Sequence, residues 1–171
     1  THLRFATICN EAPIAVDMKT RKRGTNIASV AKSYGKHGVG IKYVPGVAGQ
    51  TTFGVMQPID VGACTVIALA NPVNEAVTGC VWAQRNGSAK QIDFLFNTAH
   101  TSSVQAGALS FFMFDGAATV STVTASSAIT GNWAWYAGTS TGPSGTTNLY
   151  RDGVLLATGT NNSGAALVDT G

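Results

Sequence analysis

The sequence predicts an all-β fold in which two antiparallel sheets pack face to face, as a sandwich or jelly roll. Three observations carry this prediction. Charged residues make up only 11% of the 171 residues, and good helix formers such as Glu are scarce beside Gly, Ala, Thr, Ser and Val. Apolar and polar residues alternate with period two in many short segments. Turn signals recur about every 8–12 residues, which is typical of sandwiches and barrels.

The N-terminal half of the chain contains several short segments of strand character. Alternation and breaks at Gly and Pro indicate two strands near 39–44 and 51–56. The run 63–70 is continuously apolar and contains β-branched residues, so it is predicted to be a central strand buried on both faces. A strand at 79–84 follows and places Cys80 and Trp82 on one face.

The middle of the chain continues the pattern. In the segment 91–97, Ile92, Phe94 and Phe96 alternate with Asp93 and Leu95, which predicts a strand with two different faces. A polar loop is expected over 98–107. Further strands are predicted at 109–114 and 119–125.

The segment 132–157 carries the clearest strand and turn pattern. Trp133 and Trp135 alternate with Ala134 and Tyr136, as in a strand with two distinct faces. The polar, Gly- and Pro-containing run 141–145 is expected to be a loop.

Asp152-Gly153 then separates two apolar runs, 148–151 and 154–157. Asp-Gly is a strong hairpin signal, because a type I′ turn needs positive φ at both central residues. The expected register places Arg151 opposite Val154 and Tyr150 opposite Leu155.

These segments resemble a known family. Trp133, Ala137-Gly138-Thr139 and the run 149–154 resemble the central motif of concanavalin A-like, laminin-G-like jelly rolls. The segment 38–43 resembles the opening strand of that family, and 64–72 resembles its strand that ends in a turn proline. The resemblance implies a concanavalin A-like jelly roll. It does not select a function, because this fold hosts lectins, glycosidases, adhesion modules and virion proteins.

The charges of the chain are unevenly distributed. Up to Lys42 there are eight Lys and Arg against two acids, and afterwards three against six. We therefore expect residues 1–35 to form a basic N-terminal arm and 36–171 to form the jelly roll. The densest basic run contributes four candidate residues for subunit contact: Lys19, Arg21, Lys22 and Arg23. The alternative is a solvated turn. Nucleic acid is disfavoured, since its binders usually add aromatic residues and a larger basic face.

The C-terminal part is shorter than the resemblance implies. In the family, more strands normally follow the Asp-Gly hairpin, whereas this sequence ends about fourteen residues after Ala157. Two explanations remain open. Either the sequence ends early, or the closing strand comes from the N-terminal arm or from a neighbouring subunit, which would cover an otherwise open sheet edge.

The acids and histidines do not predict a catalytic or metal site. Glycosidases of this fold place two carboxyl groups close together on one strand, but no two acids in this sequence stand two or four positions apart. The three histidines have no flanking triad or metal pattern, and Cys9, Cys64 and Cys80 have no zinc-type spacing. We expect no enzymatic activity, no metal and no cofactor.

Carbohydrate binding is a more specific prediction than catalysis for this sequence. Sugars stack on exposed aromatic rings while polar side chains orient their hydroxyls. The aromatic candidates are Tyr136, Trp135 and Trp82, with Tyr136 expected to be the most exposed because Trp135 would share the core face of Trp133. Asn161 and Asn162 are the candidate loop donors.

The composition and the arm most resemble tailed-bacteriophage virion proteins that carry this module. The segment 16–21, leading through a polar stretch to Gly38, resembles the lead-in of those phage domains. The expected function is a non-enzymatic structural protein of a virus particle, a head decoration or tail component, with a glycan-contacting surface. Its expected partners are other virion proteins, further copies of itself in a homo-oligomer and host surface glycans. It would be assembled in the host cytoplasm and reside on the virion. No apolar run approaches the roughly 20 residues of a membrane span.

Two alternatives stay open. The first is a secreted or cell-surface lectin-like carbohydrate-binding module. The second is a divergent glycoside hydrolase, which would have to assemble its two carboxyl groups from distant strands.

Overall fold

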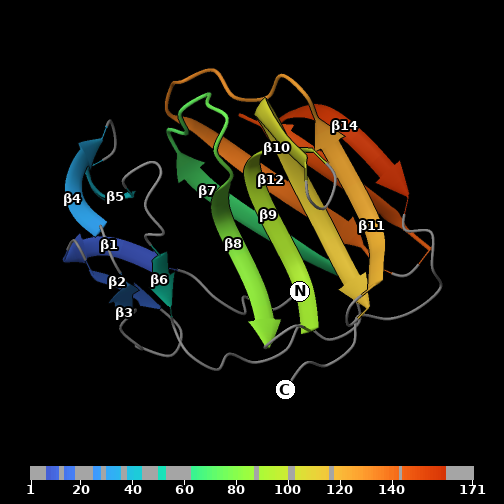
Figure 1. The fold of residues 1–171 in the computed structure, drawn as a ribbon, viewed down its shortest axis with the longest axis horizontal. Coiled ribbons are helices and arrows are strands. Elements are labelled where there is room, and N and C mark those ends of the chain that lie inside the picture. Colours follow the sequence, from blue (N-terminus) through green and yellow to red (C-terminus); the bar gives the residue numbers. More distant parts are fainter. Residues whose placement is uncertain are drawn as a thin grey trace. The chain divides into compact units, whose positions relative to one another are not determined.

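The computed structural model describes residues 7–11, 14–17, 25–27, 30–35, 38–43, 50–52, 63–86, 89–99, 103–115, 118–142 and 144–160. All regular elements in these ranges are β-strands, so the prediction of an all-β fold is confirmed for this part of the chain (Figure 1). The chain divides into two compact units, 1–57 and 58–171. Each unit is described by itself.

The described residues of the first unit form three antiparallel strand pairs. They are β1 (Thr7–Glu11) with β2 (Ile14–Asp17), β3 (Thr25–Ile27) with β6 (Gln50–Thr52), and β4 (Val30–Gly35) with β5 (Gly38–Tyr43). The strand predicted at 39–44 corresponds to β5. The arm boundary predicted after residue 35 falls between β4 and β5, which pair with each other, and the division of the chain there stays a prediction. The four basic residues predicted to contact a subunit, Lys19, Arg21, Lys22 and Arg23, lie outside the described residues.

The described residues of the second unit form two four-stranded antiparallel sheets, as predicted for a sandwich. The first sheet has the order β11-β10-β9-β8, and the second has the order β14-β13-β12-β7. Figure 1 shows the first sheet lying over the second. The strands are β7 (Ala63–Ala70), β8 (Gly79–Asn86), β9 (Ala89–Ala99), β10 (Ser103–Asp115), β11 (Ala118–Ala125), β12 (Ala134–Thr141), β13 (Thr146–Arg151) and β14 (Val154–Thr160).

The chain crosses between the two sheets twice, and one side chain ties both crossings together. The segment 71–78 leads from β7 to β8, and the segment 126–133 leads from β11 to β12. Asn97, at φ 56° in β9, donates from Nδ2 to the Val73 carbonyl at 2.8 Å and accepts at Oδ1 from the Gly107 N–H at 2.9 Å. The Gly107 carbonyl in turn accepts from the Ile129 N–H at 3.0 Å. Asn97 therefore bonds directly to the first crossing segment, and Gly107 connects Asn97 to the second.

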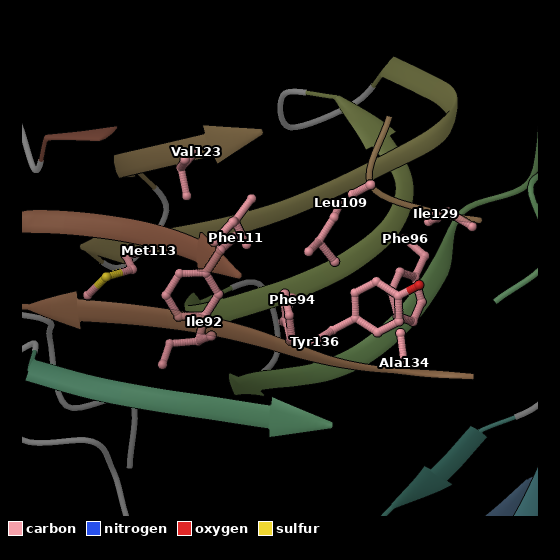
Figure 2. Packing of buried hydrophobic residues seen from close by; sticks show 12 residues of the cluster. Ile92, Phe94, Phe96, Leu109, Phe111, Met113, Val123, Ile129, Ala134 and Tyr136 are labelled. Atoms are coloured by element: carbon pink, nitrogen blue, oxygen red, sulfur yellow. The ribbon is translucent and has the colours of Figure 1, made fainter. Parts of the chain in front are cut away.

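The core between the sheets is aromatic (Figure 2). Phe94 meets Phe111 edge to face with ring centroids 5.7 Å apart, and Phe96 meets Tyr136 in the same manner at 4.9 Å. Such edge-to-face pairs add to the free energy gained from area burial alone. The first pair joins neighbouring strands of one sheet, whereas the second joins β9 to β12 across the sandwich.

Gly138 lets β12 approach the first sheet closely. A Cβ atom at this position would lie 2.7 Å from Cδ2 and 2.8 Å from Cγ of the Phe111 ring. Real Cβ atoms essentially never come that close to another heavy atom, so the missing side chain is what makes room for the ring.

The prediction that 63–70 is a central strand buried on both faces is wrong. Its bounds match β7, but β7 lies at the end of its sheet in the described part of the chain, and Ile67 is 62% exposed. Among the side chains whose burial is described, most of those on both faces of β9 and β10 are buried. One face of these two strands contributes to the core between the sheets. The opposite face carries a second apolar cluster of Leu95, Phe112 and Phe114.

The polar loop predicted over 98–107 is also wrong. β9 extends to Ala99, and β10 already begins at Ser103. The register between these strands shifts between Val104 and Leu109. Extra residues in one strand interrupt the period-two pattern, so a bulge resembles a loop in the sequence.

Candidate functional site

The exposure of the two neighbouring aromatic residues of β12 is the reverse of what the sequence predicted. Trp135 is 51% exposed, whereas Tyr136 is fully buried, so the expectation that Tyr136 is the more exposed residue is wrong. Tyr136 shares its face with Gly138, which packs on Phe111. Trp133 precedes the first residue of β12, so its partial burial does not set the alternation of that strand.

Of the other predicted sugar-binding residues, only Trp82 lies in the described part of the chain, and it does not belong to the exposed surface around Trp135. Trp82 is partly buried and packs against the core cluster. Asn161 and Asn162 lie outside the described residues. Of the three predicted aromatic residues, Trp135 is therefore the one whose side chain is half exposed.

Trp135 shares its face of the sheet with residues that were not predicted as binding residues. Antiparallel partners share one face of a sheet, so the registers of the second sheet define rows across its outer face, the face turned away from the core. One row is Leu69 and Trp135; the next is Ile67, Ala137, Tyr150 and Leu155; the third is Thr65, Thr139, Asn148 and Thr158. We call these ten residues the outer face.

The outer face combines apolar, aromatic and small polar side chains. Trp135, Ile67 and Leu155 are each more than half exposed, and Tyr150 between them is partly exposed. The threonine and asparagine row follows directly, with Thr65 and Thr158 exposed. None of the ten residues carries a charge. A contiguous apolar surface rimmed by polar groups is typical of an interaction site.

The Asp152-Gly153 turn fixes the position of Trp135. Both turn residues have positive φ, 50° and 80°, and Tyr150 pairs with Leu155 and Arg151 with Val154, so the predicted turn geometry and register are confirmed. The Trp135 N–H donates to Asp152 Oδ1 at 2.9 Å, and the Asp152 N–H donates to the Trp135 carbonyl at 2.8 Å. The Trp135 backbone is thus held on both sides while its ring faces outward.

The charged groups near this end of the sheet face elsewhere. Arg151 pairs with the inward-facing Tyr136, and its Nη1 donates to the Ala128 carbonyl at 2.7 Å. Burial raises the pKa of the Tyr136 hydroxyl, against a smaller lowering by Arg151 and with a further rise from Asp152. Tyr136 therefore stays neutral at physiological pH.

Two aspartates of the described residues have evident structural positions. Asp93 is buried in the first sheet, and Asp152 belongs to the turn beside Trp135. Among the described residues, no group of three or more His, Cys, Asp or Glu side chains is placed to hold a metal ion. The same residues contain no helix long and apolar enough to cross a membrane.

Burial also raises the pKa of the Cys64 thiol, to about 12 from an ordinary value of 9.0, because the thiol faces the core from β7. Above pH 9 the unfolded chain releases this proton while the folded chain keeps it, so stability falls as pH rises toward 12. Between neutral pH and roughly pH 10.5 this thiol should cost the fold about 2 kcal/mol.

The Cys64→Ala variant isolates this effect, because every other titrating group is unchanged. Urea unfolding at the two pH values should show a loss about 2 kcal/mol smaller for Cys64→Ala than for the unmodified chain. Equal losses in the two proteins would show that Cys64 titrates normally in the fold.

The described strands thus define an all-β unit of two antiparallel four-stranded sheets with an uncharged, aromatic outer face. Comparisons with protein-family models, with curated proteins and with solved structures find no match to this chain.

Proposed function

We propose that the protein is a non-enzymatic structural component of a virus particle and that its outer face contacts carbohydrate. The observation that carries the carbohydrate contact is the half-exposed Trp135 ring on the same sheet face as a row of threonine and asparagine side chains, with the row of Tyr150 between them. The charge-poor, Ala-, Thr-, Gly- and Ser-rich composition and the resemblance to phage jelly rolls support the virion role. Head and tail positions are equally compatible with these features.

The outer face has the chemistry that sugar recognition requires. The faces of sugar rings are apolar and stack on aromatic side chains, which Trp135 and Tyr150 provide. Sugar hydroxyls need hydrogen-bond partners, which Thr139 and Asn148 provide on neighbouring strands. Trp135 and Thr139 are four positions apart on β12, so the face extends about 13 Å along the strand at about 3.3 Å per residue. This length suits an oligosaccharide better than a single sugar.

The ligand is expected to be neutral. Neither a lysine nor an arginine lies on the outer face to pair with a carboxylate, sulfate or phosphate, and Arg151 is already engaged with the Ala128 carbonyl. Charge-assisted hydrogen bonds are the stronger ones in anion recognition, so their absence from this face disfavours acidic glycans.

Replacing Trp135 with alanine should weaken binding to neutral glycans at least tenfold, because the stacking surface is lost. The fold should be retained, since the ring is half exposed and the hydrogen bonds to Asp152 involve only the Trp135 backbone. Isothermal titration with neutral and acidic oligosaccharides measures the change.

Val154→Ala is the matched control for Trp135→Ala. Val154 is also an exposed apolar residue, but it pairs with Arg151 and lies outside the outer face. Its removal should leave glycan affinity unchanged. A chain that binds no neutral glycan, or that binds equally well with and without Trp135, would refute the proposed contact.

The virion role has a separate test. Antibody detection of this chain in density-purified virus particles, compared with the soluble fraction of the same lysate, should place it with the particles. Glycan binding by a chain found only in the soluble or secreted fraction would instead support the lectin-like alternative. Hydrolysis of the bound glycans would point to the glycoside hydrolase alternative.

A further inference from the structure

The strand at one end of the second sheet has an edge unlike those of the other outermost strands in the two four-stranded sheets. β7 pairs with β12 along all eight of its residues without any shift in register. The outermost strands β8, β11 and β14 each show a register shift against their partners. Bulges twist an edge and hinder the pairing of another strand, so β8, β11 and β14 have a protection that β7 lacks.

The residues of β7 add no protection of their own. The segment 63–70 contains no charge and no proline, the two residue features that usually keep an edge strand from pairing. Thr65, Val66 and Ile67 at its centre are β-branched and favour extended backbone. In the part of the chain that the structure describes, no strand pairs with this edge. An uncovered, regular and uncharged edge is a template for another strand, so a stable protein is expected to cover it.

We infer that β7 pairs antiparallel with β7 of a second copy of this chain, which joins two second sheets into one continuous sheet. Main-chain hydrogen bonds along the two edges would supply the contact, as in other strand additions. The inference does not depend on the carbohydrate or virion role.

The identity of the occupant follows from self-complementarity. A two-fold axis brings the same residues of both copies against one another, and like charges in such a pair would repel. β7 has none, so it meets this condition along its whole length. When the axis is normal to the sheet, core-facing residues oppose core-facing residues and outer residues oppose outer residues.

Ile67 lies at the centre of this contact. Two central registers keep the core-facing and outer residues on their own faces. Pairing centred on Val66 places Ile67 opposite Thr65 of the second copy, and pairing centred on Ile67 places it opposite Ile67 of the second copy. The exposed Ile67 side chain would then be covered by its counterpart or by a threonine. Cross-strand pairs of β-branched residues stabilise antiparallel sheets.

The test uses the full chain and compares two lysine substitutions on the same face of the same sheet. Ile67→Lys introduces a charge at the β7 edge, whereas Leu155→Lys introduces one on β14 at the opposite end of the sheet. Both replaced residues are more than half exposed, so neither change disturbs the core. Sedimentation velocity over a hundredfold range of concentration measures the dimer dissociation constant.

The unmodified chain and Leu155→Lys should sediment as dimers at micromolar concentration. Ile67→Lys should raise the dissociation constant at least tenfold, and high salt should restore part of the loss by screening the repulsion. A monomer at tens of micromolar for the unmodified chain, or equal effects of the two lysines, would overturn the inference.

Hydrogen exchange gives a second readout that needs no substitution. Dilution below the dissociation constant should speed exchange in peptides that cover 63–70 and leave peptides that cover 154–160 unchanged. Exchange in β7 that does not depend on concentration would exclude the pairing even if Ile67→Lys failed to fold.

Discussion

Replacing Gly138 with alanine is expected to lower the free energy of unfolding by about 3 kcal/mol, at the upper end of what overpacking usually costs. The new Cβ would lie 2.7 Å from the Phe111 ring, which is fully buried and packed edge to face on Phe94. β12 pairs with strands on both sides, so it cannot move away without breaking two ladders. Urea unfolding followed by tryptophan fluorescence measures the loss.

A double-mutant cycle attributes the loss to the ring. In a Phe111→Leu background the new methyl group gains space, so Gly138→Ala should cost at least 1 kcal/mol less there than in the unmodified chain. Gly79→Ala is the matched control, because its Cβ would meet Phe96 at an ordinary 3.6 Å. A loss as large for Gly79→Ala, or no coupling with Phe111→Leu, would contradict the assigned cause.

Replacing Asn97 with alanine should also cost about 3 kcal/mol or more. The change leaves the buried Gly107 N–H without its partner, which costs about 1–3 kcal/mol, and removes the part-buried bond to the Val73 carbonyl, worth about 1 kcal/mol. Asn97 also has φ 56°, a conformation that alanine tolerates less well than asparagine. Unfolding in urea again gives the magnitude.

Two further substitutions separate the roles of Asn97. Asn97→Asp keeps an acceptor for the Gly107 N–H but has no donor for the Val73 carbonyl when ionised. Asn97→Gly accepts the positive φ but makes neither hydrogen bond. Asn97→Gly should fall between the unmodified chain and Asn97→Ala, whereas Asn97→Asp, whose carboxylate would face the Val73 carbonyl from a buried position, should cost at least as much as Asn97→Ala. Asn132→Ala, which removes a long, exposed bond to Thr130, should change stability by less than about 0.5 kcal/mol. Asn97→Ala as mild as this control would show that the crossings do not depend on Asn97.

Local signals in the sequence predicted the Asp152-Gly153 hairpin and the two faces of β9 well. The register around Asp152-Gly153 followed from turn chemistry alone, and the alternation of Phe94 and Phe96 with Asp93 and Leu95 correctly gave β9 two faces. These signals are local because a two-residue turn fixes which residues face each other.

The sheet position of a strand and the face on which a side chain lies depend on residues that are distant in the sequence, and local signals did not predict them. The apolar run 63–70 has the residues of a fully buried strand, yet its place in the sheet depends on pairing with β12 alone. Tyr136 and Trp135 could both be assigned to either face of a strand, and Gly138 packing on Phe111 decides the choice. The outer face combines residues of four strands, so only the sheet order shows that Ile67 and Leu155 share it.

Several expectations remain predictions. The division into an arm of residues 1–35 and a jelly roll from residue 36, the contact of that arm with a second chain, and the resemblance to concanavalin A-like proteins belong to this group. The β7 edge offers a different route to an oligomer, and the lysine pair at Ile67 and Leu155 tests that route without involving the N-terminal residues.

The sheet order also governs the sequence of events when the chain is made. β8 to β11 are neighbours in both sequence and space, and so are β12 to β14, whereas β7 must wait for β12 while the whole first sheet is synthesised between them. Closing so long a loop is slow compared with forming hairpins. During this interval the apolar segment 63–70 lacks both of its native surroundings, the ladder with β12 and the core beneath it. A nascent chain stalled before residue 141 would therefore be the species most in need of a chaperone.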